Sequence, residues 1–137
     1  MLSEDQINEI LKEVSEKPFV SGILLTGSYV YGNPNEESDL DIRIITNDGS
    51  NIDDRNSEKF GVRIEAFYNS PEQIRNYFQD AIESGDEPSV HFWANGKITY
   101  DPEGIVLELQ NEAKRIWEKG PKNGKWKTRA EYLAKHG

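Results

Sequence analysis

Two aspartates separated by a single residue are the feature of this chain best suited to chemistry. Asp39 and Asp41 open the segment DLDIRIIT at residues 39–46, where polar and apolar residues alternate as in a half-buried strand. Residues i and i+2 of a strand share one face and lie roughly 6–7 Å apart. Two carboxylates at that spacing repel each other. A divalent metal ion removes the repulsion, and Mg²⁺ is usually held by one or two carboxylates together with substrate phosphates.

A third carboxylate, Glu65, lies in the segment FGVRIEAFY at residues 60–68, which is also predicted to be a strand. On a neighbouring strand it would complete a site for two metal ions about 3.5–4 Å apart. Such a pair stabilises both the attacking and the leaving oxygen of an in-line phosphoryl displacement. The pattern therefore predicts Asp39, Asp41 and Glu65 as metal ligands and catalytic residues.

The Gly27-Ser28 pair directly follows the buried strand predicted at residues 19–26, FVSGILLT. Glycine permits the backbone to approach a ligand closely. The next residues, YVYG, could form one helical turn whose free N–H groups point at an anion. We expect Gly27 and Ser28 to bind the terminal phosphates of a nucleotide.

The whole segment GSYVYGNPNEESDLDIRI, residues 27–44, resembles the signature of the DNA polymerase beta-like nucleotidyltransferase superfamily. The likeness is closest to the minimal nucleotidyltransferases and the nucleotidyl-transferring drug-resistance enzymes, and it extends over roughly residues 3–118. Glu65 fits the third acid of that family. The residues that match the signature are Gly27, Ser28, Gly32, Ser38, Asp39 and Asp41.

The resemblance implies a reaction in which a nucleoside triphosphate, with ATP favoured, binds together with two Mg²⁺ ions. An acceptor hydroxyl attacks the alpha-phosphate and pyrophosphate leaves. Asp39 and Asp41 would bind metal, and Glu65 would bind the catalytic metal and take the acceptor's proton. Two positions depart from the family pattern. Tyr31 stands where many minimal members have a basic residue. Arg43 stands where an apolar residue is common, and it could pair with Glu65 or an aspartate, or reach a phosphate.

The elements that must position these residues can be predicted from periodicity and end signals. Helices are expected at 4–16, from Ser70-Pro71 to Gly85, at 88–95, and from Asp101-Pro102 to Gly120, with one more at 126–135. Strands are expected at 19–26, 39–46, 60–68 and 97–100, and residues 47–58 are predicted to form a polar loop. This order predicts an α+β fold with a mixed, mostly antiparallel sheet backed by helices. We expect residues 1–120 to form a nucleotidyltransferase core and residues 121–137 a basic C-terminal tail or short helix.

The composition of the chain limits the kinds of acceptor that it is expected to bind. The chain has 137 residues and a net charge of −9, with 8 Lys and Arg against 20 Asp and Glu in residues 1–101. Such an acidic body disfavours a long nucleic acid, so the acceptor is expected to be a small molecule or a protein. The absence of cysteine, of a signal sequence and of any long apolar stretch suggests a cytoplasmic protein without a membrane span.

Other functions stay open at this level. The chain could be an antitoxin-like or nucleotide-binding module that acts on or with a protein partner, such as a helical protein or a second copy of itself. It could also be a two-metal hydrolase. A minimal enzyme, a fragment of a longer one, and an enzyme completed by a partner are all compatible with the sequence.

Overall fold

The structure is a computed structural model, and it describes residues 1–86 and 88–127. Five strands form one sheet in the order β3-β4-β2-β1-β5. The strands are β1 (Val20–Thr26), β2 (Leu40–Thr46), β3 (Ile52–Lys59), β4 (Val62–Asn69) and β5 (Lys97–Tyr100). Only β2 and β4 run parallel, and the other three neighbouring pairs are antiparallel. The predicted α+β fold with a mixed, mostly antiparallel sheet is therefore confirmed.

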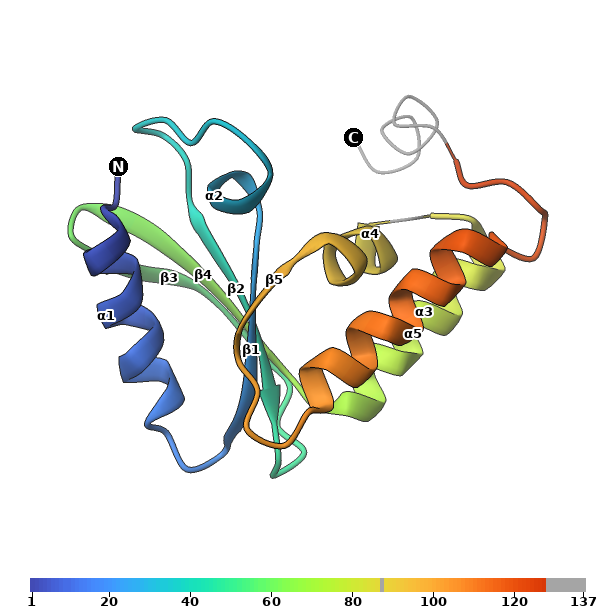
Figure 1. Cartoon of the computed structure of the whole chain (residues 1–137), viewed down its shortest axis with the longest axis horizontal. Coiled ribbons are helices and arrows are strands. Elements are labelled where there is room, and N and C mark those ends of the chain that lie inside the picture. Colours follow the sequence, from blue (N-terminus) through green and yellow to red (C-terminus); the bar gives the residue numbers. More distant parts are fainter. Residues whose placement is uncertain (87, 128–137) are drawn as a thin grey trace.

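Helices cover both faces of the sheet (Figure 1). Helix α1 (Glu4–Ser15) packs on one face, where Ile10, Leu11 and Val14 join the apolar residues of the strands in one core cluster. On the other face lie α3 (Pro71–Ser84), α4 (Pro88–Asn95) and α5 (Ile105–Lys119), which form a second cluster around Leu24 and Ile45. The short helix α2 (Ser28–Tyr31) follows β1 directly. Among the described residues, no helix combines the length and the apolar character that crossing a bilayer requires.

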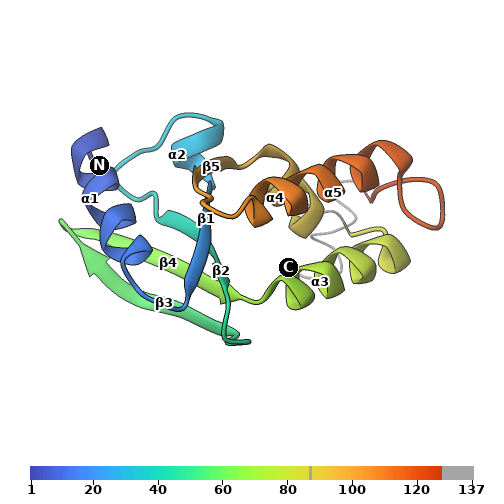
Figure 2. The same cartoon turned by 60° about the horizontal axis from the view of Figure 1, so that its bottom comes forward.

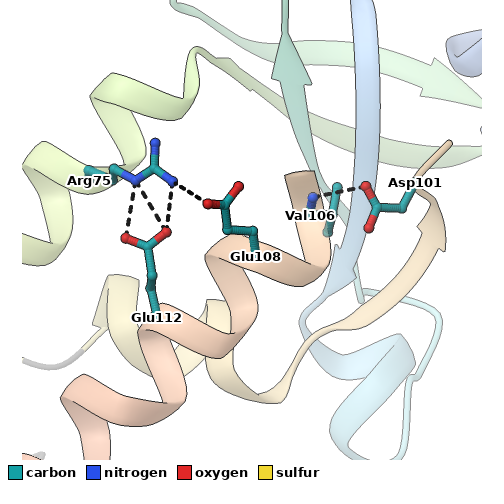
Figure 3. Close-up of polar contacts among 5 residues, drawn as sticks. All are labelled: Arg75, Asp101, Val106, Glu108 and Glu112. Carbon is teal, nitrogen blue, oxygen red and sulfur yellow. Dashed lines mark hydrogen bonds and ion pairs between the residues drawn. The ribbon is translucent and has the colours of Figure 1, made fainter. Parts of the chain in front are cut away.

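Helices α3 and α5 run side by side on their face of the sheet (Figure 2). Arg75 of α3 binds Glu112 of α5 through two guanidinium nitrogens, with an Nη2–Oε2 distance of 2.8 Å, and also lies 3.6 Å from Glu108 (Figure 3). Ser70 caps α3 by accepting a hydrogen bond from the Gln73 amide, as its sequence predicted. Tyr29 and Val30 of α2, by contrast, pack against the core cluster on the α1 side of the sheet.

Two sequence predictions about element boundaries were wrong. Residues 52–58 belong to the loop predicted at 47–58, but they form most of the edge strand β3 (Ile52–Lys59). A tight turn at Phe60 and Gly61, both with positive φ, connects β3 to its antiparallel partner β4. An edge strand that is polar on both sides shows no alternation, so pattern reading misses it. Helix α5 begins at Ile105 rather than at Pro102. The Asp101 carboxylate nevertheless caps it by accepting the Val106 amide at 2.9 Å (Figure 3). It also accepts the Leu107 amide at 2.9 Å. The helix predicted at 126–135 falls almost wholly outside the described residues.

Candidate active site

The register of the sheet brings Asp41 and Glu65 together. Asp41 of β2 pairs with Glu65 on the parallel neighbour β4 and with Thr26 on the antiparallel neighbour β1. The three residues therefore form one row across the three central strands, at the end of β1 and the start of β2, and we call this row the acidic row. Thr26 is almost fully buried. Asp39 lies just before β2, close enough for its charge to act on Asp41.

Gly27 continues the chain from this row into α2. Its φ of +83° lies in a region that residues with a side chain rarely adopt, and a Cβ placed there would collide with the Asp41 carboxylate. The Gly27 carbonyl accepts the amides of Val30 and Tyr31, at 2.9 and 3.1 Å, and so starts the single turn of α2. The first N–H groups of a helical turn have no partner within it. The structure thus confirms the predicted helical turn and places its start against the Asp41 carboxylate.

Asp41 is partly buried and lies close enough to Glu65 for the charge of one carboxylate to act on the other. Burial, followed by the nearby charge of Glu65, raises the pKa of Asp41 to about 6, while Arg43 works in the opposite direction. Glu65 is itself paired with Arg63, with an Nη2–Oε1 distance of 3.0 Å, and its side chain is 20% exposed. A cation that binds between the two carboxylates would relieve their repulsion.

Carboxylates crowded in this way suit a hard divalent ion such as Mg²⁺, which prefers oxygen ligands. Across residues 1–86 and 88–127, however, no three His, Asp or Glu side chains are gathered into a ready-made ligand set. The structure therefore brings two of the predicted ligands, Asp41 and Glu65, to the same point. Asp39 stays at the edge of the pair. The chemistry of the three residues fits the predicted ions, and the present side-chain positions do not form a closed cage.

The volume of the surface clefts does not by itself identify this candidate active site. A cleft of about 520 Å³ lies at the opposite ends of β2 and β4, where Thr46, Ser70 and Ile105 are among the residues that line it. Large clefts are the usual first candidates for a binding site. Charge, register and the glycine turn favour the row of Thr26, Asp41 and Glu65 instead.

A model of the nucleotidyltransferase domain family matches residues 7–121. The chain belongs to the nucleotidyltransferase domain family. The match covers both the glycine turn and the acidic row, so the family resemblance predicted from residues 27–44 is confirmed.

Solved structures of related shape agree with this fold. A nucleotidyltransferase-like protein from Exiguobacterium sibiricum 255-15 superposes with a TM-score of 0.57 and 15% identity, over 81% of this chain and 38% of that one. This chain thus spans well under half the length of that protein, and at such low identity the likeness establishes the fold alone. Among curated protein sequences, none matches.

Two toxin–antitoxin structures also match, one with AMP-PNP and one a mutant of MntA-HpeT. Their identities are 15% and 14%, over 85% of this chain and 88% of each of those. Their TM-scores of 0.47 and 0.46 are too low to support an argument.

The environment of Arg43 answers a question that the sequence left open. In this nucleotidyltransferase domain the Arg43 guanidinium lies between two aromatic rings, 4.2 Å from the centroid of Phe67 and 4.8 Å from that of Phe92. Its Nε donates to the Thr26 hydroxyl at 3.4 Å. It forms no ion pair with any residue of the described chain. Arg43 is therefore a cation held by aromatic contacts beside the acidic row.

Tyr31, the other departure from the family pattern, ties α2 to α4. Its hydroxyl donates to the Phe92 carbonyl at 3.4 Å, and its ring lies 5.8 Å from that of His91. Burial is the main cause that raises the pKa of the Tyr31 hydroxyl. Sequence reasoning assigned no site role to Phe67 or Phe92. Strand alternation placed Phe67 on the face of Glu65, but nothing in the sequence brought Phe92 of α4 to the same place.

Proposed function

We propose that this chain transfers a nucleoside monophosphate from a nucleoside triphosphate, with ATP as the favoured donor, to an acceptor hydroxyl. The observation that carries the proposal is the row of Thr26, Asp41 and Glu65, which ends at a glycine turn pressed against the Asp41 carboxylate. One end of the row suits phosphates and the other suits metal-bound oxygens. Nucleotidyl transfer requires both within a few ångströms of each other.

In the proposed reaction the acceptor oxygen attacks the alpha-phosphorus and forms a new P–O bond. The bond from that phosphorus to its bridging oxygen breaks, and pyrophosphate leaves. Gly27 and Ser28 hold the terminal phosphates through backbone amides and the serine hydroxyl. Glu65 accepts the proton of the attacking hydroxyl. Asp39, Asp41 and Glu65 would hold two Mg²⁺ ions, which supply the positive charge that stabilises the attacking and leaving oxygens.

We assign the catalytic core to residues 1–120, which the family match at 7–121 supports. Residues 121–137 would form a basic tail or short helix outside it. The acceptor belongs to a small molecule or a protein, because a chain with a net charge of −9 repels a long polyanion. The cytoplasm, where nucleoside triphosphates and Mg²⁺ occur together, is the compartment that suits this reaction.

The test is to incubate the purified chain with each nucleotide labelled at its alpha-phosphate, Mg²⁺ and cell extract, and to identify what becomes labelled. We expect a labelled small molecule or protein and stoichiometric pyrophosphate. Asp41→Asn should abolish labelling, whereas Asp80→Asn, the same change at an exposed position of α3, should leave it intact. Labelling that persists in the Asp41→Asn variant would contradict the proposal. Release of free monophosphate without any acceptor would indicate a hydrolase instead.

A further inference from the structure

Strand β3 carries a bulge directly opposite Glu65. In the antiparallel pairing of β3 with β4, Asp54 faces Ala66 and Ser57 faces Ile64. Two residues, Arg55 and Asn56, therefore stand opposite the single residue Glu65. Bulges of this kind redirect side chains and are common next to active sites. The bulge places the backbone of Arg55 opposite Glu65, the residue that we propose to accept the acceptor's proton.

Two guanidinium groups meet at one aromatic ring here. Phe67 follows Glu65 by two residues on β4 and so shares its face of the sheet. The Arg43 guanidinium lies 4.2 Å from the Phe67 ring centroid, and the Arg55 guanidinium lies 5.2 Å from it. Contacts between a cation and a ring face hold both groups without neutralising them. Two positively charged groups, one from β2 and one from β3, therefore lie against a single ring of the intervening strand β4.

Neither guanidinium is committed to a close acidic partner. Arg43 has no ion pair within residues 1–86 and 88–127. Arg55 lies 3.8 Å from Asp53, and both side chains are more than half exposed, so this pair contributes little. Arg63 differs, because it binds Glu65 at 3.0 Å and donates to the Arg55 carbonyl at 2.9 Å. Arg43 and Arg55 therefore keep donors available for a ligand.

We propose that Arg55 and Arg43 bind an oxyanion, a phosphate or a carboxylate, carried by the small acceptor, and so select anionic acceptors over neutral or cationic ones. This inference rests on the proposed nucleotidyl transfer, in which the acceptor hydroxyl approaches Glu65. The planar guanidinium fork matches two oxygens of either oxyanion. Arg43 and Arg55 are both held against the Phe67 ring, in a chain whose net charge is −9.

The test is equilibrium dialysis of the full chain with labelled inorganic phosphate in one arm and labelled acetate in another. Mg²⁺ and a saturating non-hydrolysable ATP analogue are present, so that the phosphate site proposed at Gly27 and Ser28 is already occupied. We expect one oxyanion to bind, and its affinity to fall about tenfold or more in Arg55→Gln. Arg115→Gln, the same change at an exposed position of α5, should bind as the wild type does. The arm that binds more tightly identifies the acceptor group as phosphate or carboxylate.

Arg55 lies at an exposed bulge of an edge strand, so its replacement should not prevent folding. Arg43→Gln is the second variant and should weaken the oxyanion in the same way. Equal affinity in the wild type and both variants would overturn the inference, as would no oxyanion binding at all. Displacement of the oxyanion by a DNA oligonucleotide but by no small hydroxy acid would overturn the class of acceptor proposed here.

Binding of the ATP analogue is measured separately. If the analogue fails to bind, the proposed function fails, and the comparison of the arginine variants is then made without it. If the analogue binds and the variants do not differ, only this inference fails.

Discussion

Replacing Asp41 by asparagine should abolish transfer and yet stabilise the folded chain. Burial and the charge of Glu65 raise the pKa of Asp41 from 3.8 to about 6. A carboxyl whose pKa is raised by folding binds its proton more tightly in the folded state. The contribution of Asp41 to stability is therefore most favourable at low pH, is lost as pH rises from about 4 to about 6, and stays lost above that range. Asparagine carries no charge and avoids this loss.

The size of the effect follows from the same shift. A change of about two pKa units corresponds to about 3 kcal/mol at 1.36 kcal/mol per unit. Asp41 is only partly buried, so solvent screening reduces this to about 1–2 kcal/mol at pH 7.5. For a chain of this length that is a rise of about 3–6 °C in Tm. At pH 4.5 the gain should shrink to about a third, because most of the folded wild type is then protonated at Asp41.

The assay is thermal or urea unfolding of wild type and Asp41→Asn at pH 7.5 and 4.5, with a chelator present. Asp80→Asn serves as the control for the chemical change and should show no such gain at either pH. Adding Mg²⁺ at pH 7.5 should stabilise the wild type and have little effect on Asp41→Asn. A variant no more stable than the wild type at pH 7.5, or a gain of the same size at both pH values, would refute the reasoning.

Three further predictions concern the glycine turn at Gly27, the proposed base Glu65 and the cap of helix α5 at Asp101. Gly27→Ala should lower activity by about 100-fold or more and stability by about 1–3 kcal/mol, measured by labelling and by urea unfolding. Gly49→Ala, at a position that also has a positive φ but has no atom within 4 Å of an added Cβ, should lose stability alone. Glu65→Gln should reduce the rate about 10²–10⁴-fold with folding intact, as initial rates and circular dichroism would show; an unchanged rate would remove Glu65 as the base. Asp101→Ala should lower the free energy of unfolding by about 1 kcal/mol through loss of the α5 cap, with kcat unchanged; a protein as stable as the wild type would contradict that role.

The local sequence pattern was sufficient to predict a helix or strand where one face of that element is buried. The alternation around Asp41 and the Ser70-Pro71 start predicted β2 and α3 with boundaries within a residue or two, and the helix expected at 4–16 is α1. The same approach failed for β3, because both faces of that edge strand are polar and its pairing depends on a turn rather than on burial. It also misplaced the start of α5, since the cap at Asp101 acts from outside the helix.

From the sequence alone came the residue types and their spacing: a glycine–serine turn after a buried strand, two aspartates on one strand face, and a lone glutamate on another. These are local properties, set by the alternation of strands and by the few conformations open to glycine. Only the tertiary structure decided that Asp41 and Glu65 are direct neighbours, because the parallel register of β2 and β4 depends on contacts between segments far apart in the chain. The positions of Arg43 between Phe67 and Phe92, and of Arg55 at a bulge beside Glu65, depend on how three strands and α4 pack together, which no local pattern records.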